Sequence, residues 1–172
     1  MTTRAKNSLS KFFKKLKDVV QDTQTPTEMR ALGNEAIDII VKRSRLGYGA
    51  PEGSSPGQRF RFARLSEDYI NFRKKSGVLS EFTSAGKSNI TFTGQLLDSM
   101  KIVRISKGVV TISPTGSRKD KYSRPGKTNL SVAEHLAEQG RTFNRLTIPE
   151  YKQLIRFYRT RFGDLQRRRS LT

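Results

Sequence analysis

A short helix followed directly by a β-hairpin is the densest local pattern in this sequence. The helix falls within residues 91–100, Thr-Phe-Thr-Gly-Gln-Leu-Leu-Asp-Ser-Met. Thr93 is expected to be the N-cap, because its hydroxyl can accept a hydrogen bond from a backbone N–H that the first turn leaves unpaired. Leu96, Leu97 and Met100 then share one apolar side of the helix. The segments on either side have to pack against this unit.

The hairpin is predicted from two β-rich runs with a turn between them. Residues 102–106 and 109–112 are rich in valine and isoleucine, which favour strands. Lys107-Gly108 suits a tight connection, and Pro114 ends the second strand.

The longest predicted helix begins at a strong start signal. Thr25 is the expected cap, Pro26 the first helical residue, and Glu28 completes a capping box. The helix is expected to run to about Leu46 and to be a main core helix. Its apolar residues recur at helical spacing: Met29, Leu32, Ala36, Ile37, Ile40 and Val41.

A Gly/Pro-rich stretch and two short elements come next. Residues 47–58 are expected to form a loop, and the absence of a Gly-Lys-Ser/Thr ending argues against a phosphate-binding loop. Residues 59–62 alternate arginine with phenylalanine and predict a short strand or an extended arm. Ser66 is the expected cap of a brief helix from Glu67 to about Lys75.

The next predicted helix is short. Ser131 and Glu134 have capping-box spacing and would open a helix from Val132 to about Gln139. Gly140 would stop this helix.

The last helix is predicted from a third capping box. Residues 141–146 are expected to be extended or to form an edge strand. Thr147 and Glu150 then open a helix with apolar residues at helical spacing, in which Gly163 is a candidate break. Residues 167–172 read as a basic tail.

These elements predict an α+β fold: a small antiparallel sheet built on the hairpin, packed with a long N-terminal helix and a C-terminal helix. Residues 1–25 are expected to be a basic amphipathic extension, and residues 26–166 a single domain. The domain would contain the long loops 47–58 and 114–130, and the basic tail 167–172 would follow it.

The N-terminal extension contains an amphipathic helix pattern at residues 9–20. Apolar side chains share one face and lysines the other. We expect the apolar face to lie on this domain or on a neighbouring subunit, with Phe12, Phe13 and Leu16 as the subunit-contact residues. Binding to a membrane surface and binding of nucleic acid by the lysines are the alternatives. The extension lacks the apolar core of a signal peptide, and no run in the chain is long enough to span a membrane.

The net charge of the chain limits the kinds of partner that it can bind. Its 172 residues contain 34 Lys and Arg against 15 Asp and Glu, a net charge of +19. A chain with this charge repels itself and attracts polyanions: nucleic acid, an acidic protein surface or anionic lipid. It contains no cysteine, which excludes disulfides and thiolate sites and fits synthesis in the cytoplasm.

A second long loop carries much of the basic charge. Residues 115–129 hold five cations and a single acid, and loops of this length are usually functional or disordered. The five cations of this loop are Arg118, Lys119, Lys121, Arg124 and Lys127.

No pattern predicts catalysis, a metal site or a cofactor. The single histidine, His135, has Glu138 three residues on and is expected to be structural. No zinc, helix-turn-helix or RNA-binding motif is present, so nucleic-acid contact would be electrostatic and independent of sequence. In the run from Arg156 to Arg159 the aromatic residues are expected to be buried and the arginines exposed.

The order of the motifs resembles the tail-completion (head–tail joining, virion-morphogenesis) proteins of tailed bacteriophages. The similarity covers roughly residues 27–166 and is carried by a T-G-x-L-x-x-S signature, whose matching residues here are Thr93, Gly94, Leu96, Leu97 and Ser99. The accompanying motifs are Phe62-Ala63-Arg64-Leu65-Ser66 before it, and the hairpin, 132–140, 141–146 and Thr147-Ile148-Pro149-Glu150 after it.

The resemblance implies a structural protein without a catalytic site. It would form a ring at the head–tail junction of the virion, with six copies favoured and twelve as the other option, around non-specifically held DNA. The residues expected to face that DNA are then the loop cations Arg118, Lys119, Lys121, Arg124 and Lys127. The neighbours would be neck or connector proteins and a tail terminator or tail tube protein, and the hairpin edge would join the subunit contacts. Heterologous contacts close into rings when the rotation permits. The alternative is a sequence-independent nucleic-acid-binding protein.

Overall fold

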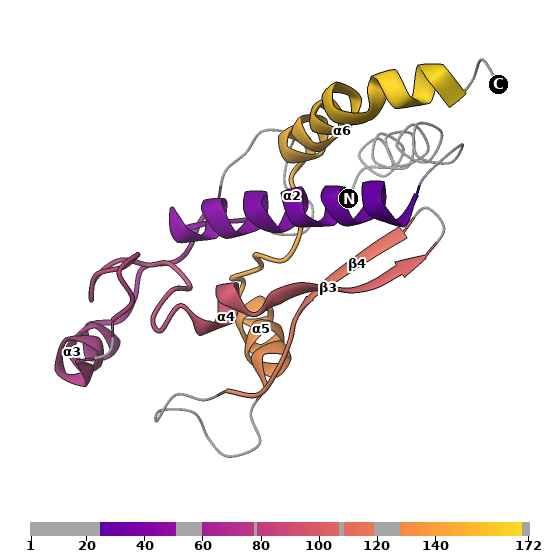
Figure 1. Ribbon diagram of the computed structural model, residues 1–172. Helices are drawn as coiled ribbons and strands as arrows, with labels where there is room; N and C mark the ends of the chain where they lie inside the picture. Colours follow the sequence, from indigo (N-terminus) through magenta and orange to yellow (C-terminus); the bar gives the residue numbers. More distant parts are fainter. Residues whose placement is uncertain (1–24, 51–59, 78, 107–108, 119–127, 170–172) are drawn as a thin grey trace, which may run out of the picture.

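A computed structural model gives the fold of this chain (Figure 1). It describes residues 25–50, 60–77, 79–106, 109–118 and 128–169. For residues 164–169 it describes the backbone alone. These residues form five helices and two antiparallel two-stranded sheets, which confirms the predicted α+β class. The predicted helix at 9–20 and most of the basic loop lie outside the described residues. None of the described helices has the length and apolar character needed to cross a membrane.

The long helix α2 (Pro26–Arg45) starts as predicted. The Thr25 hydroxyl accepts a hydrogen bond from the Glu28 backbone N–H (3.3 Å), and the Glu28 carboxylate accepts one from the Thr25 backbone N–H (3.0 Å). Both halves of the capping box therefore form and fix the start of the helix.

The hairpin pairs β3 (Met100–Ser106) with β4 (Val109–Pro114), so both strands are longer than predicted. The register shifts between Ile102 and Arg104, which leaves Val103 unmatched and half exposed. One face of the hairpin lies on α2 at Gly33, where a Cβ atom would come within 2.6 Å of Ile102 Cδ1.

The last helix, α6 (Ile148–Arg169), lies along α2. Figure 1 shows α2 between the hairpin and this helix, so the body has three layers. Two predictions about α6 were wrong. Gly163 does not interrupt the helix, and residues 167–169 continue it although they were assigned to the tail.

A second small sheet begins inside the stretch predicted to be a loop. Strand β1 (Tyr48–Gly49) pairs with β2 (Phe60–Arg61), so the loop prediction for 47–58 was wrong at residues 48 and 49. The strand option for residues 59–62 is confirmed at Phe60 and Arg61. Each polar backbone group at the end of a strand needs a partner, and the Phe62 N–H donates to the Gly47 carbonyl (2.9 Å).

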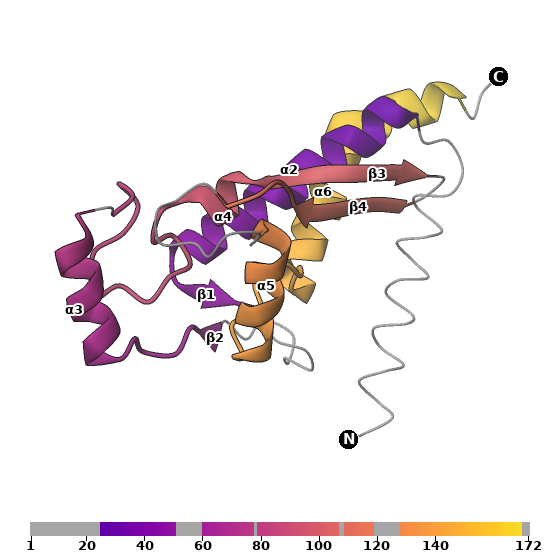
Figure 2. The same cartoon turned by 90° about the horizontal axis from the view of Figure 1, so that it is seen from below.

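The short helix α3 (Glu67–Ser76) stands apart from the body of the molecule, as both views show (Figures 1 and 2). Ser66 caps it as predicted, accepting a hydrogen bond from the Tyr69 N–H (3.3 Å). Gly77 ends it with a positive φ of 64°.

The caps of two short helices differ from prediction. Helix α4 (Gln95–Asp98) is capped by Gly94 rather than Thr93, because the chain enters it with a left-handed φ of 77° and no side chain makes a capping bond. Helix α5 (Asn129–Glu138) begins three residues before the predicted start.

Thr128 caps α5, in place of the predicted Ser131. The Thr128 hydroxyl accepts from the Ser131 N–H (3.0 Å), and the Ser131 hydroxyl lies 3.1 Å from the Thr128 N–H. Ser131 thus fills the third helical position of the box rather than the cap. Asn129 explains the earlier start, because it is buried and its side-chain amide donates to the Thr115 carbonyl (2.8 Å).

Residues 141–146 contain no strand, so the edge-strand option was wrong. Their backbone still holds the second sheet, because the Ala50 N–H donates to the Thr142 carbonyl (2.8 Å). In the third predicted capping box the Glu150 carboxylate accepts from the Thr147 N–H (2.7 Å). The main apolar cluster joins α2, α4, β3 and α5 with residues of three connecting segments: Ile40, Phe62, Ile90, Leu96, Leu97, Met100, Ala133 and Phe143.

Candidate functional site

The T-G-x-L-x-x-S segment lies at the base of the hairpin and has a structural role. Leu96 and Leu97 are buried in the main apolar cluster. The Ser99 hydroxyl donates to the Leu96 carbonyl (2.7 Å), and the Ser99 carbonyl accepts from both the backbone N–H and the hydroxyl of Thr115 (3.0 and 3.1 Å). Helix α4 is therefore tied to the residue that follows β4.

Gly94 suits its position because its φ is left-handed, a conformation that other residues rarely adopt. A Cβ atom there would also lie 3.1 Å from the Asp98 carboxylate, a close contact that a small shift of this flexible side chain relieves. Thr93 is half-buried, and Gly94 caps α4 in its place. The motif residues thus set the direction of the hairpin and form no cluster of reactive groups.

Of the five loop cations expected to face DNA, only Arg118 lies within the described residues. It is half-buried, and its guanidinium is 3.5 Å from the Asn129 side-chain oxygen. Beside it, Ser117 forms a β-bridge with Thr128, which brings the two ends of the basic loop together. Lys119, Lys121, Arg124 and Lys127 lie outside the described residues, as do Phe12, Phe13 and Leu16.

A row of cations runs along α6, in which Lys152 joins the two arginines of the 156–159 run that the sequence analysis expected to be exposed. Lys152, Arg156 and Arg159 are exposed. The expected division of the 156–159 run is confirmed in part: Tyr158 is buried and both arginines are exposed, whereas Phe157 is half-buried. The spacing of four and then three residues is the signal that could have identified the row.

The N-terminal turn of α6 is joined to α2 by a buried ion pair. The Arg43 guanidinium pairs with the Glu150 carboxylate and also donates to the backbone carbonyls of Phe143 and Arg145, the latter at 2.8 Å. Burial lowers the pKa of Arg43 from its ordinary value, and the charge of Glu150 opposes that shift. Glu150 is therefore committed to the packing of α2 on α6.

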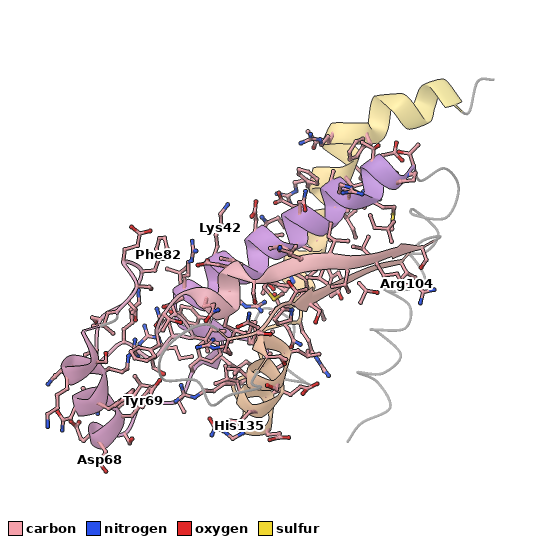
Figure 3. All side chains as sticks on the ribbon, turned by 60° about the horizontal axis from the view of Figure 1, so that its bottom comes forward. Lys42, Asp68, Tyr69, Phe82, Arg104 and His135 are labelled. Carbon is pink, nitrogen blue, oxygen red and sulfur yellow. The ribbon has the colours of Figure 1, made fainter. Side chains whose placement is uncertain are left out.

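The arm formed by α3 and residues 79–93 has an exposed aromatic surface. The rings of Tyr69 and Phe72 are stacked with centroids 5.9 Å apart, and Phe92 lies 5.9 Å from Phe72. Tyr69 and Phe72 are 39% and 40% exposed. Figure 3 shows Tyr69 and Asp68 on this helix, away from the three-layered body. This surface is therefore a candidate site of contact with another molecule.

An open cleft of about 710 Å³ separates the arm from the end of α2. Its lining includes Lys42, Arg45, Phe82 and Lys87, and Figure 3 shows Lys42 and Phe82 on this side of the molecule. The Arg45 guanidinium lies 3.7 Å from the centre of the Phe82 ring and pairs with Asp98 at 3.1 Å. The guanidinium of Arg45 therefore already has partners within the chain.

His135 is exposed near the end of α5 (Figure 3). Its Nδ1 lies 3.5 Å from the Glu138 carboxylate, as the three-residue spacing suggested, and its Nε2 lies 3.1 Å from the Gln139 amide. Within the described part of the chain, no group of three or more His, Cys, Asp or Glu residues could hold a metal ion.

Comparison with protein-family models, curated proteins and solved structures found no match for this chain.

Proposed function

We propose that this chain is a structural subunit of the neck of a tailed bacteriophage, where copies form a ring around DNA between the head connector and the tail. The observation that carries the proposal is the T-G-x-L-x-x-S segment, which forms α4 and joins it to the hairpin through Ser99 and Thr115. A long helix precedes this unit, and a short helix and a last helix follow it, in the order of the family's motifs.

The surface of the chain supports an assembly role. Most of the exposed large apolar side chains in the described residues belong to two places, the arm with the adjacent end of α2, and the tip half of the hairpin. They are Leu46, Tyr69, Phe72, Leu79 and Phe82 in the first and Val103 and Val109 in the second. Two separate apolar surfaces suit heterologous contacts, in which different patches of neighbouring copies meet.

Sequence-independent nucleic-acid binding is the second candidate function. The exposed row on α6 and the net charge of +19 favour it. The two candidates differ in the expected size of the free protein.

Mass photometry and electron microscopy of the purified chain, with and without duplex DNA, test the proposal. We expect rings of six or twelve copies. A particle that stays monomeric and coats DNA in low salt, releasing it in high salt, would favour the second candidate.

A pair of variants makes the assembly test specific. Phe12→Asp/Phe13→Asp is expected to abolish assembly and incorporation into virions without changing the unfolding of residues 26–166. Lys14→Asp/Lys15→Asp, on the predicted polar face, is the control and should still assemble. Assembly of the phenylalanine variant at the level of the unmodified chain would exclude the N-terminal segment as a subunit contact.

A further inference from the structure

We infer that one flank of α6, formed by Lys152, Arg156 and Arg159, is a binding surface for the phosphate backbone of DNA. The three residues are seven positions apart from first to last. An α-helix turns about 100° and rises about 1.5 Å per residue, so their Cα positions lie within about 60° of one another and span about 10 Å. The inference rests on the proposed function in that DNA is the expected polyanion, and it names the residues that would contact it.

Among the described residues, this flank of α6 is exposed. Leu154, Tyr158 and Phe162 are buried and occupy a different side of the helix. Arg161 also lies away from the row, with its guanidinium 5.7 Å from the centre of the Phe157 ring and 5.9 Å from that of Phe162. The row is thus separate from the arginine that contacts aromatic rings.

No carboxylate among the described residues lies within ion-pair distance of the row. Glu150 is the only acid among the described side chains of α6, and Arg43 and the Thr147 N–H occupy its carboxylate. By contrast, Arg45 has Asp98 as its partner. Three adjacent like charges without counter-charges repel one another, and an external polyanion would remove this repulsion.

The chemistry of the flank favours phosphates over an acidic protein. Protein interfaces usually contain an apolar core, and none of the exposed large apolar side chains in the described residues belongs to α6. Contacts to a nucleic-acid backbone need no such core, and arginine binds phosphate oxygens through two parallel hydrogen bonds. The views in Figures 1 and 2 place α6 away from the α3 arm, so DNA and the exposed aromatic surface would occupy different ends of the molecule.

The salt dependence of DNA binding by the full chain tests this inference. Each phosphate contact contributes about 0.9 to the slope of the logarithm of the binding constant against the logarithm of salt concentration. Lys152→Gln/Arg156→Gln/Arg159→Gln is therefore expected to lower the slope by about 2.7, measured by fluorescence anisotropy with a short labelled duplex.

A matched variant distinguishes DNA binding by the α6 flank from a general effect of the net charge. Arg64→Gln/Lys74→Gln/Lys75→Gln removes the same charge from exposed residues on and beside α3. It should change the slope far less than the α6 variant. An equal loss in both variants, or no DNA binding by the unmodified chain, would overturn the inference. Equally tight binding of polyglutamate, lost in the α6 variant, would assign the flank to an acidic protein and overturn the DNA assignment.

Mass photometry of the same samples distinguishes the two proposals. Rings with an unchanged slope in the α6 variant would leave the neck function standing and remove this inference. A reduced slope in a chain that forms no rings and enters no virions would support the flank as a DNA surface and remove the neck function.

Discussion

Two glycines within helices differ in how closely other atoms surround them. At the first of them, a single residue determines how closely two layers pack. A Cβ atom on Gly33 would lie 2.6 Å from Ile102 Cδ1 and 2.9 Å from Val110 Cγ1, so the hairpin approaches α2 at the glycine. A Cβ atom on Gly163 in α6 would have no described atom within 4 Å. The same substitution should therefore have opposite effects at the two positions.

Gly33→Ala is expected to destabilise the protein. Overpacking typically costs about 1–3 kcal/mol, which exceeds or cancels the helix preference of about 0.5–1 kcal/mol that alanine gains over glycine. Gly163→Ala should gain about 0.5–1 kcal/mol because only the helix preference acts there. Urea unfolding of both variants measures the difference, and a stabilised Gly33→Ala would show that the hairpin moves away from α2 without cost.

Two arginines two positions apart in α2 make ion pairs of different burial. The Arg43 side chain is 7% exposed, pairs with Glu150 and donates hydrogen bonds to two backbone carbonyls. The Arg45 side chain is 29% exposed and pairs with the exposed Asp98. Arg43→Ala leaves buried acceptors without donors and should cost about 3–5 kcal/mol. Arg45→Ala should cost less, about 1–2 kcal/mol, because water replaces its exposed ion pair and the other loss is the contact with the Phe82 ring. Equal losses in chemical denaturation would contradict the role of Arg43 as the link between α2 and α6.

At the scale of elements, helix starts set by local capping residues could be predicted from the sequence, whereas helix starts that depend on tertiary contacts could not. Thr25 and Ser66 cap the expected helices because a capping bond joins residues three apart. The prediction of Thr93 as the N-cap of α4 was wrong, because Gly94, with a left-handed φ, is the N-cap residue. The early start of α5 depends on the contact between Asn129 and Thr115, fourteen residues away.

The candidate site shows the same division. The spacing of Lys152, Arg156 and Arg159 is visible in the sequence, so the row could have been predicted. The absence of a carboxylate partner among the described residues could not have been predicted, because Glu150 is occupied by Arg43, 107 residues away in the chain. Pairings over such separations depend on how the layers stack.

The α3 arm depends on a buried arginine. Arg73 is 1% exposed, and its guanidinium donates to the Lys87 carbonyl (3.0 Å) and the Thr83 hydroxyl (2.9 Å). Burial lowers the pKa of this guanidinium from its ordinary value. Asn89 accepts from the Thr83 hydroxyl (2.7 Å) and donates to the Arg45 carbonyl (3.1 Å), which continues the network to the end of α2.

Arg73→Met should loosen the arm and leave the three layers intact. It removes both donors, and the loss of these two partly buried hydrogen bonds should cost about 1–3 kcal/mol in total. Hydrogen exchange is expected to accelerate in residues 67–93 and to stay unchanged in α2 and the hairpin. Lys74→Met, one position on and exposed, is the control. Faster exchange throughout the chain would mean that the arm and the body unfold together.

At the scale of the whole molecule, the net charge of +19 opposes the compact state. Raising the salt concentration from about 0.01 to about 0.1 M shortens the screening length from about 30 to about 10 Å, which weakens repulsion between distant cations. We therefore expect the midpoint of thermal unfolding to rise by a few degrees, since about 1 kcal/mol corresponds to about 2–4 °C for a chain of this size. The Arg64→Gln/Lys74→Gln/Lys75→Gln variant, whose net charge is smaller, should respond less. A midpoint that falls with salt would show that attractive pairs such as Arg45–Asp98 outweigh the repulsion, and the stability of the free chain would then no longer argue for a polyanionic partner.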